Sequence, residues 1–441
     1  MAACEAVHSS SQKPPPPRST KPGYFLSKTG GIWLACGFVF LALLHLLCCS
    51  PRGAQEAAFT HVLQYANDAY SKLRSGSGSG GGGAQPPCDY SEGRWVWAPG
   101  HARRYNATVC DVKEAQDCLR NGRPDTGYLD WRWQPAAGCP LPAFDAAAFL
   151  TAVRGKHVAF VGDSMARNQG ESLICLLTSA VPFRAVDRDP VNYRRHFMRW
   201  AFPTYDVTVS IYWAPFLAKA TGKCVNYSMP YNLVHLDVPA DRWAADADTM
   251  DVVLLASSHW VLNPAVYHKG GEVVGVHGHP ELNHTEIGYA EPLRQVYRMA
   301  VERLSQGRPR TVVLATYSPT HFENHPLDDP TACANKEPYK EGEKELGGMD
   351  KELRSIVVEE AEAAVKRNGG PDGGTTRIEV LDVTKLAAMR PDGHPGAYMH
   401  RNPFANGVPQ KLPTDCLHFC MPGPADTFNE ILQQILMKRR D

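Results

Sequence analysis

Short apolar runs alternate with longer amphipathic stretches through most of the chain. Five runs rich in β-branched residues have the length of strands: 157–161, 207–212, 252–256, 312–315 and 378–381. Such continuous runs are typical of strands buried on both faces, as in a parallel sheet covered by helices. The stretches 292–304 and 352–366 have the length and pattern of covering helices. The pattern therefore predicts an α/β fold, namely an α/β/α sandwich with a mostly parallel sheet.

One apolar run near the N-terminus has a different character. Residues 30–49 carry no formal charge, and about 20 apolar residues are enough to cross a bilayer as a helix. Four basic residues and one acidic residue precede this run, so the positive-inside rule leaves residues 1–29 in the cytosol as a tail. A cleaved signal peptide is the alternative, but the run is longer than the apolar core of most signal peptides. We therefore expect one transmembrane signal anchor, a type II orientation and a luminal body.

The rest of the chain divides by composition into three segments. Residues 50–87 are typical of a short helical stem and a flexible linker, because the Gly/Ser run at 76–83 has no side chains that form a core. Residues 88–150 are dense in Cys, Trp, Pro and Gly with little periodicity, so we expect cross-links and aromatic packing to hold this segment. Residues 151–441 contain the predicted strands and helices and form the main domain.

The composition of the 441 residues, 43% hydrophobic and 21% charged, is that of a folded protein. Its 46 basic and 46 acidic residues leave no net charge, which argues against a nucleic-acid partner because such binding needs a basic field. Nine of the 13 cysteines lie between Cys88 and Cys420, which indicates an oxidising compartment. The glycosylation sequons at Asn106, Asn226 and Asn283 agree with a luminal location.

The first predicted strand of the main domain is followed directly by Gly162-Asp163-Ser164 and then by a helical stretch. This order places Ser164 at a strand-to-helix turn on the carboxyl edge of the sheet, where ligands and nucleophiles gather. Gly162 permits a tight turn, and the amides of the first helical turn face a developing negative charge, as acyl transfer requires. The alternative is an ordinary helix N-terminus with Asp163 or Ser164 as the cap.

A second pair of chemical groups, Asp415 and His418, lies near the C-terminus. Their spacing of three residues places a carboxylate and an imidazole on one short turn. His418 would accept the proton of Ser164, while Asp415 would fix the imidazole tautomer and stabilise the imidazolium. The alternative is a structural ion pair. Together the two motifs, at opposite ends of one α/β domain, predict a Ser-His-Asp catalytic triad.

Several motifs resemble those of a known family, and they extend from residue 88 to the end of the chain. They are Cys88-Asp-Tyr-Ser-Glu-Gly-Arg-Trp-Val, Gly122-Arg-Pro-Asp, Tyr128-Leu-Asp-Trp-Arg-Trp, Gly162-Asp-Ser-x-x-Arg-Asn-Gln and Asp415-Cys-Leu-His-Phe-Cys-x-Pro-Gly. Together they resemble the plant TRICHOME BIREFRINGENCE-LIKE family of Golgi polysaccharide O-acetyltransferases. The Gly-Arg-Pro-Asp and Trp-Arg-Trp motifs, with Ser318-Pro-Thr-His-Phe-Glu-Asn, are most similar to the ALTERED XYLOGLUCAN branch, which contains xyloglucan and mannan acetyltransferases.

The resemblance implies an SGNH-hydrolase-like fold and transfer of acetyl to a sugar hydroxyl, with acetyl-CoA or another acetyl donor as co-substrate. Ser164 would carry the acetyl group in a double displacement, with His418 as the base and Asp415 as its partner. No bound cofactor and no metal are expected. Further residues match positions that line the family's site as oxyanion or substrate contacts: Gly162, Asp163, Arg167, Asn168, Ser258 and Trp260. Family members commonly have Gly where this chain has Ser258, whose amide would still serve an oxyanion.

The family pattern also implies four disulfides. The implied pairs are Cys88–Cys139, Cys110–Cys175, Cys118–Cys420 and Cys333–Cys416. Two of them would tie distant segments to the Asp415-x-x-His418 turn and so position the base. Cys224 is left over.

Two other groups of residues have a structural interpretation that we favour over a functional one. Four histidines lack the spaced Cys or carboxylate partners of a zinc site, so a solvated loop is favoured over a metal site. They are His268, His277, His279 and His284. Four tryptophans would be able to stack on sugars, but core packing is favoured because Trp buries a large area. They are Trp95, Trp97, Trp131 and Trp133.

Three hypotheses of function follow. The first is a Golgi enzyme that O-acetylates a hemicellulose, with xyloglucan preferred over mannan or xylan. The second is a polysaccharide acetylesterase, which uses the same triad but lets water attack the acyl-enzyme. The third is a non-catalytic binder of cell-wall glycan, suggested by the Trp-rich segment. The sequence does not define the glycan, the hydroxyl, the immediate acetyl donor or the oligomeric state.

Overall fold

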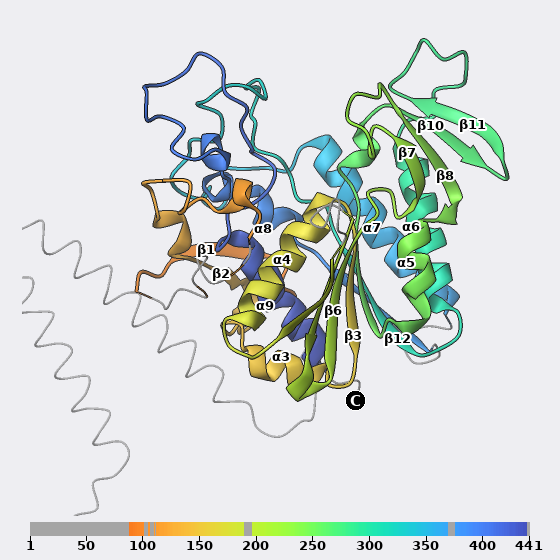
Figure 1. Ribbon diagram of the computed structural model, residues 1–441, viewed down its shortest axis with the longest axis horizontal. Coiled ribbons are helices and arrows are strands. Elements are labelled where there is room, and N and C mark those ends of the chain that lie inside the picture. The colour runs from red at the N-terminus through yellow and green to blue at the C-terminus, as the bar shows by residue number, and fades with distance from the viewer. Residues whose placement is uncertain are drawn as a thin grey trace, which may run out of the picture. The chain divides into compact units, whose positions relative to one another are not determined.

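The computed structural model describes residues 88–100, 105, 110, 112–188, 196–368 and 375–438 (Figure 1). Contacts divide the chain between residues 86 and 87, and the architecture below belongs to residues 87–441. The predicted cytosolic tail, membrane span, stem and linker lie outside the described residues, as does the sequon at Asn106. Within the described ranges, no helix is long and apolar enough to cross a membrane.

A sheet of seven strands forms the middle of the unit. In spatial order its strands are β13 (Thr376–Leu381), β12 (Arg310–Ala315), β9 (Val252–Ala256), β3 (His157–Gly162), β6 (Val207–Trp213), β5 (Phe197–Phe202) and β4 (Arg184–Arg188). The strands from β13 to β6 run parallel, and they are the five that the apolar runs predict. The mostly parallel sheet is confirmed. The antiparallel strands β5 and β4 were not predicted, because charged residues interrupt their apolar runs.

Helices cover both faces of this sheet (Figure 1). One face packs against α3 (Ala146–Ala152), α4 (Ser164–Thr178) and α9 (Pro424–Met437), together with the short α8 (Thr384–Ala388). The other face packs against α5 (Asp241–Asp246), α6 (Ala290–Ser305) and α7 (Gly348–Arg367). The α/β/α sandwich is therefore confirmed, and the two predicted helices are present as α6 and α7.

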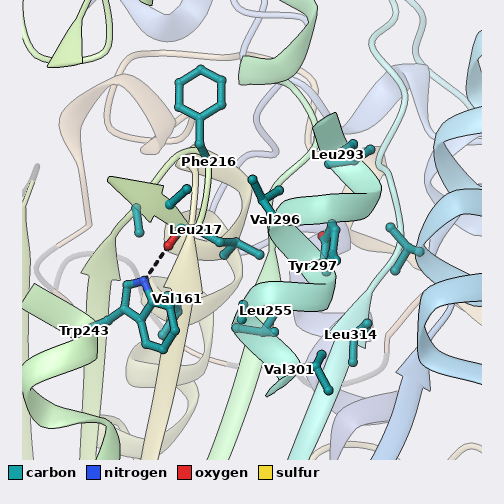
Figure 2. Packing of buried hydrophobic residues seen from close by; sticks show 14 of the residues in the cluster. Val161, Phe216, Leu217, Trp243, Leu255, Leu293, Val296, Tyr297, Val301 and Leu314 are labelled. Carbon is teal, nitrogen blue, oxygen red and sulfur yellow. Dashed lines mark hydrogen bonds between the residues drawn. The ribbon is translucent and has the colours of Figure 1, made fainter. Parts of the chain in front are cut away.

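Aliphatic side chains of the central strands form the core beneath α6 (Figure 2). Val161 of β3, Leu255 of β9 and Leu314 of β12 have no exposed surface. Helix α6 buries residues that recur every three to four positions, which is the period of an amphipathic helix facing a core: Leu293, Val296, Tyr297, Ala300, Val301 and Leu304. This core fixes β3 between two parallel neighbours, and β3 leads into the turn that carries Ser164.

A second sheet of four strands is built from two insertions that the sequence pattern did not reveal. Its spatial order is β11 (Glu272–His277), β10 (Ala265–Lys269), β8 (Asn232–Pro239) and β7 (Ala218–Gly222). Many of its side chains are exposed, so its strands lack the continuous apolar runs of the main sheet. His268 and His277 lie on this sheet. In the part of the chain that the structure describes, no group of three or more His, Cys, Asp or Glu is placed to hold a metal ion.

The Cys/Trp-rich segment contains a two-stranded sheet in which β1 (Gly93–Trp97) pairs antiparallel with β2 (Trp131–Pro135). Trp95 and Trp133 are buried and stack edge-on at 5.5 Å, as core packing predicts, whereas Trp97 is 51% exposed. Single turns of 3-10 helix complete the unit: Glu114–Gln116, Gly127–Leu129, Ala136–Gly138, Pro203–Tyr205, Ala247–Thr249, Trp260–Leu262, Pro391–Gly393 and Ala397–Met399.

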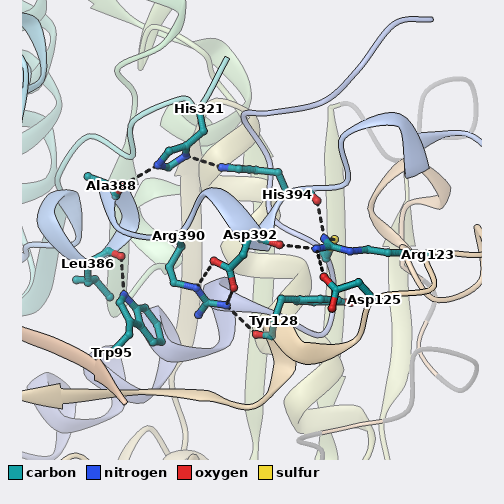
Figure 3. Close-up of polar contacts among 11 residues, drawn as sticks. Trp95, Arg123, Asp125, Tyr128, His321, Leu386, Ala388, Arg390, Asp392 and His394 are labelled. Carbon is teal, nitrogen blue, oxygen red and sulfur yellow. Dashed lines mark hydrogen bonds and ion pairs between the residues drawn. The ribbon is translucent and has the colours of Figure 1, made fainter. Parts of the chain in front are cut away.

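Buried polar contacts join this segment to the main domain (Figure 3). Trp95 Nε1 donates to the carbonyl oxygen of Leu386 at 3.0 Å, and the Arg390 guanidinium lies 4.3 Å from the centre of the Trp95 ring. Arg390 forms a fully buried ion pair with Asp392 at 2.8 Å. Arg123 donates to the carbonyl oxygen of Asp392 at 2.7 Å. These charged groups are buried but paired, so the cost of removing them from water is offset.

Four disulfides link the described cysteines. They are Cys88–Cys139, Cys110–Cys175, Cys118–Cys420 and Cys333–Cys416, the same pairs that the family pattern implies. Cys224 forms no disulfide with another described cysteine, and its burial raises the pKa of its thiol to about 11. The thiol is therefore unreactive at neutral pH.

Candidate active site

The turn that carries Ser164 is anchored on the neighbouring strand. Gly162 ends β3, and a Cβ at this position would lie 1.8 Å from the carbonyl oxygen of Ala256 on β9. Only glycine therefore fits between the two strand ends. The Asp163 amide donates to the same oxygen at 2.9 Å, and Ser164 follows as the first residue of α4.

Asp163 is 1% exposed, and its carboxylate accepts three backbone N–H groups. Oδ1 accepts from Met165 at 2.9 Å and so caps α4, while Oδ2 accepts from Ser258 at 3.0 Å and from His259 at 3.2 Å. The Ser258 amide is thus already occupied, which corrects the expectation that it serves an oxyanion. Asp163 holds the start of α4 against the end of β9 and is a positioning residue.

Asp415 and His418 form a pre-arranged pair on one turn before α9. His418 Nδ1 donates to Asp415 Oδ2 at 2.7 Å, and the amides of Leu417 and His418 donate to Asp415 Oδ1 at 3.0 and 2.9 Å. Burial raises the pKa of the Asp415 carboxyl, but the His418 ring and the two amides outweigh burial and hold this pKa well below its usual value. Because Nδ1 carries the ring proton, Nε2 is the basic nitrogen.

Two disulfides hold this turn from both sides of His418. Cys416 is bridged to Cys333, and Cys420 is bridged to Cys118. The second bridge joins residues 302 positions apart in the sequence. The turn is therefore fastened to two other segments of the chain before any substrate binds.

Asn168 connects the same turn to α4, one helical turn after Ser164. Its Nδ2 donates to the carbonyl oxygen of Phe419 at 3.1 Å, and its Oδ1 accepts from the Phe419 amide at 3.3 Å. Asn168 is 1% exposed. Asn168 is predicted from the sequence to line the site, whereas in the structure its side-chain oxygen and nitrogen both hydrogen-bond to Phe419, the residue after His418.

His259 lies near the site, because its amide donates to Asp163 and its ring interacts electrostatically with His418. Its Nε2 donates to the carbonyl oxygen of Ser318 at 2.9 Å. Burial lowers the pKa of His259, Asp163 raises it and the neighbouring His418 lowers it further, so the ring stays neutral. Within the described residues, His418 Nε2 is buried and has no hydrogen-bond partner, Ser164 Oγ included. Catalytic hydrogen bonds are often long in free enzymes and tighten when substrate binds.

A cavity of about 280 Å³ lies beside α4. Arg167 and Trp213 form part of its wall, and the guanidinium lies 5.5 Å from the centre of the indole. The other lining residues are Lys113, His196, Cys224, Val225 and Tyr227. Trp260 is 9% exposed and packs edge-on against Trp213 at 5.8 Å, so it supports the wall of the cavity. Arg167 and Trp260 are predicted from the sequence, but Trp213 is not, because it ends β6 without a distinguishing motif.

The two described sequons are accessible. Asn226 and Asn283 are both exposed, on loops of the insertions that carry the second sheet. Their positions are compatible with glycosylation.

Comparison with known proteins identifies the family. Residues 141–435 match the model of the GDSL/SGNH-like acyl-esterase family found in Pmr5 and Cas1p, and residues 86–139 match the PMR5 N-terminal domain. The chain belongs to this family. It is 46% identical over 357 residues to xyloglucan O-acetyltransferase 1 of Populus trichocarpa, covering 80% of this chain and 81% of that protein.

Two relatives from Arabidopsis thaliana extend the comparison. Xyloglucan O-acetyltransferase 1 is 44% identical over 355 residues, which cover 80% of this chain and 81% of that protein. Protein trichome birefringence-like 25 is 35% identical over 360 residues, which cover 80% of this chain and 77% of that protein. The resemblance to the TRICHOME BIREFRINGENCE-LIKE family and its xyloglucan branch is confirmed.

Proposed function

We propose that this protein transfers acetyl groups to hydroxyls of a hemicellulose, xyloglucan in the first place, through an acetyl ester on Ser164. The observation that carries the proposal is the Asp415–His418 pair, clamped by Asn168 to α4 one turn after Ser164. Membership of an SGNH-like family and 44 to 46% identity to proteins named xyloglucan O-acetyltransferase support the choice of reaction and acceptor. The pair favours an enzyme over a non-catalytic binder, because binding of a glycan requires no base.

In the first half-reaction, Ser164 Oγ attacks the acetyl carbonyl of acetyl-CoA or another activated donor. His418 Nε2 takes the hydroxyl proton, and Asp415 stabilises the imidazolium. The N-terminus of α4, with the backbone N–H of Ser164, faces the negative charge that develops on the carbonyl oxygen. His418 then returns the proton to the leaving group of the donor, and the acetyl ester of Ser164 remains.

In the second half-reaction, a sugar hydroxyl attacks the ester carbonyl while His418 Nε2 accepts its proton. The proton then passes to Ser164 Oγ as the acetylated sugar leaves. The cavity beside α4 supports the proposed binding of a sugar there, because its wall combines the aromatic ring of Trp213 with the guanidinium of Arg167.

We also propose that the enzyme works in the Golgi lumen, anchored by residues 30–49. The uncharged run, the basic residues before it and the disulfides support this location. Protease protection in sealed Golgi vesicles tests it, with an epitope tag on either end of the chain. A C-terminal tag that is digested in intact vesicles would contradict a luminal body.

The function is tested with the full chain, an acetyl donor and separate xyloglucan, mannan and xylan oligosaccharides, with the products analysed by mass spectrometry. We expect an added acetyl group on xyloglucan and a covalent acetyl group on the tryptic peptide that contains Ser164. Ser164→Ala should abolish both. Ser179→Ala, at the other end of α4, is the matched control and should retain activity. Transfer by folded Ser164→Ala at the wild-type rate would refute the mechanism.

The description of the family as acyl-esterases favours a second candidate, hydrolysis of acetylated polysaccharide. In that reaction, water replaces the sugar hydroxyl in the second half-reaction. Acetate released from acetylated xyloglucan, with no transfer to the deacetylated oligosaccharide, would establish the esterase instead.

A further inference from the structure

Two buried histidines form a hydrogen-bonded chain behind the catalytic turn, and Figure 3 shows its links from Ala388 to His321 and from His321 to His394. His321 Nε2 lies 2.7 Å from the carbonyl oxygen of Ala388, and His321 Nδ1 lies 2.7 Å from His394 Nε2. His394 Nδ1 lies 2.8 Å from the carbonyl oxygen of His418. Both histidines are 1% exposed, so bulk water does not serve as a substitute hydrogen-bond partner in any of these three contacts. The chain ends on the backbone of the base itself.

The ring orientations follow from these contacts. All four ring nitrogens have a nitrogen or oxygen within 2.8 Å, and turning either ring over would place carbon atoms there instead. The two carbonyl oxygens only accept, so His321 Nε2 and His394 Nδ1 must both carry protons. Two neutral imidazoles have no proton left for the link between them. Three links need three protons, and two neutral rings bring only two.

We propose that His321 and His394 share a third proton, and that the protonated pair positions the catalytic turn through the carbonyl of His418. The positioning role rests on the function proposed above, whereas the shared proton does not. Without the third proton, two lone pairs would face each other at 2.7 Å, so one link must break. The rings then separate, and the carbonyl of His418 loses a fixed partner.

The groups around the His321–His394 pair determine how strongly it holds the third proton. The Phe419 ring stacks on His394 at 4.7 Å, an arrangement that attracts a cation. Burial lowers the pKa of both imidazoles, so the third proton is held weakly and leaves as the pH rises. The charged and titratable groups that face the pair from the surrounding elements are Arg123, Glu323, Tyr339, Lys344, Asp392, Asp415 and His418. Arg123 pairs with Asp125 and Lys344 pairs with Glu323.

Nitrogen NMR of the full chain labelled with ¹⁵N-histidine tests the shared proton without any need for activity. We expect the pair to lose one proton in a single step as the pH rises, passing from three protonated ring nitrogens to two. His321→Gln should abolish this step, because the glutamine amide replaces Nε2 as donor to Ala388 and leaves His394 neutral. His325→Gln, an exposed histidine paired with Asp329, is the matched control and should keep the step. Two unprotonated nitrogens in the pair at every pH would overturn the proposal.

The pH profile of kcat tests the positioning role. Wild-type kcat should fall by about tenfold across the step seen by NMR, because the base turn loses its fixed position. His321→Gln should remove this fall. His394→Asn provides a second variant, since its amide still donates to the carbonyl of His418, and it should also give a profile without the fall. Identical profiles in the wild type and both variants would overturn the positioning role, and an inactive wild type with the NMR step present would count against the proposed function alone.

Discussion

Asn168→Ala tests whether Asn168 positions the catalytic base, because the substitution leaves Asp415 and His418 themselves unchanged. The substitution removes both hydrogen bonds to Phe419 and leaves a buried amide and a buried carbonyl without partners. Each such group costs about 1 to 3 kcal/mol, so the free energy of unfolding should fall by about 2 to 6 kcal/mol. The two disulfides at Cys416 and Cys420 keep the turn attached, and only its contact with α4 is released. A displacement of about 1 Å between base and nucleophile lowers kcat by about 100-fold.

Urea unfolding and steady-state acetyl transfer measure these two effects. Gln169→Ala is the matched control, because Gln169 is the next residue of α4 and donates to Asn429 of α9 at 3.2 Å without touching the base turn. The control should lose stability to a similar degree but keep kcat within about threefold, as expected for an independent site. Wild-type kcat in folded Asn168→Ala, or an equal loss of kcat in both variants, would refute the argument that the clamp positions the base.

Three further predictions concern the site and its frame. Asp415→Asn should lower kcat by about 10⁴-fold with little change in KM, because the amide no longer holds the His418 tautomer; a loss below tenfold in steady-state kinetics would contradict this role. Gly162→Ala should cost about 3 kcal/mol or more in thermal unfolding, since its Cβ meets the carbonyl oxygen of Ala256, whereas Gly348→Ala, with open space around it, should cost little. Acidification from pH 7 to pH 4 should remove about 3 kcal/mol of stability through His157. Burial and then the Arg199 charge lower the pKa of His157 to about 4, so the unfolded chain takes up the proton first as the pH falls. Urea unfolding of His157→Gln across this pH range should show a shallower decline than the wild type, and equal slopes would exclude His157 as the cause.

Local sequence was sufficient for the parts of the fold whose signal lies within a few neighbouring residues. The five parallel strands are buried on both faces, so their apolar runs are unbroken and periodicity finds them. The antiparallel strands and the second sheet have exposed faces and mixed runs, so the same pattern missed them. Family motifs supplied the disulfide pairs, which spacing alone leaves open.

One part of the candidate site is likewise predictable from local sequence, and another part is not. A carboxylate and an imidazole three residues apart are close enough to meet on one short turn, so the sequence alone predicts the Asp415–His418 pair that the structure contains. The clamp from Asn168 to Phe419 joins residues 251 positions apart, and the His321–His394 link joins residues 73 positions apart. Neither contact can be predicted from the pattern of neighbouring residues in the sequence.

The sequence by itself determined the chemical groups, the strand-to-helix turn under Ser164 and the pairing of Asp415 with His418. Only the tertiary structure decided that the Ser258 amide is already occupied by Asp163, that Asn168 is a clamp and that Trp213 lines a cavity. The physical reason is that a hydrogen bond depends on where two groups lie in space. Residue types and local periodicity report which groups are present and which faces are buried, but the partner of each group is chosen only when the whole chain packs.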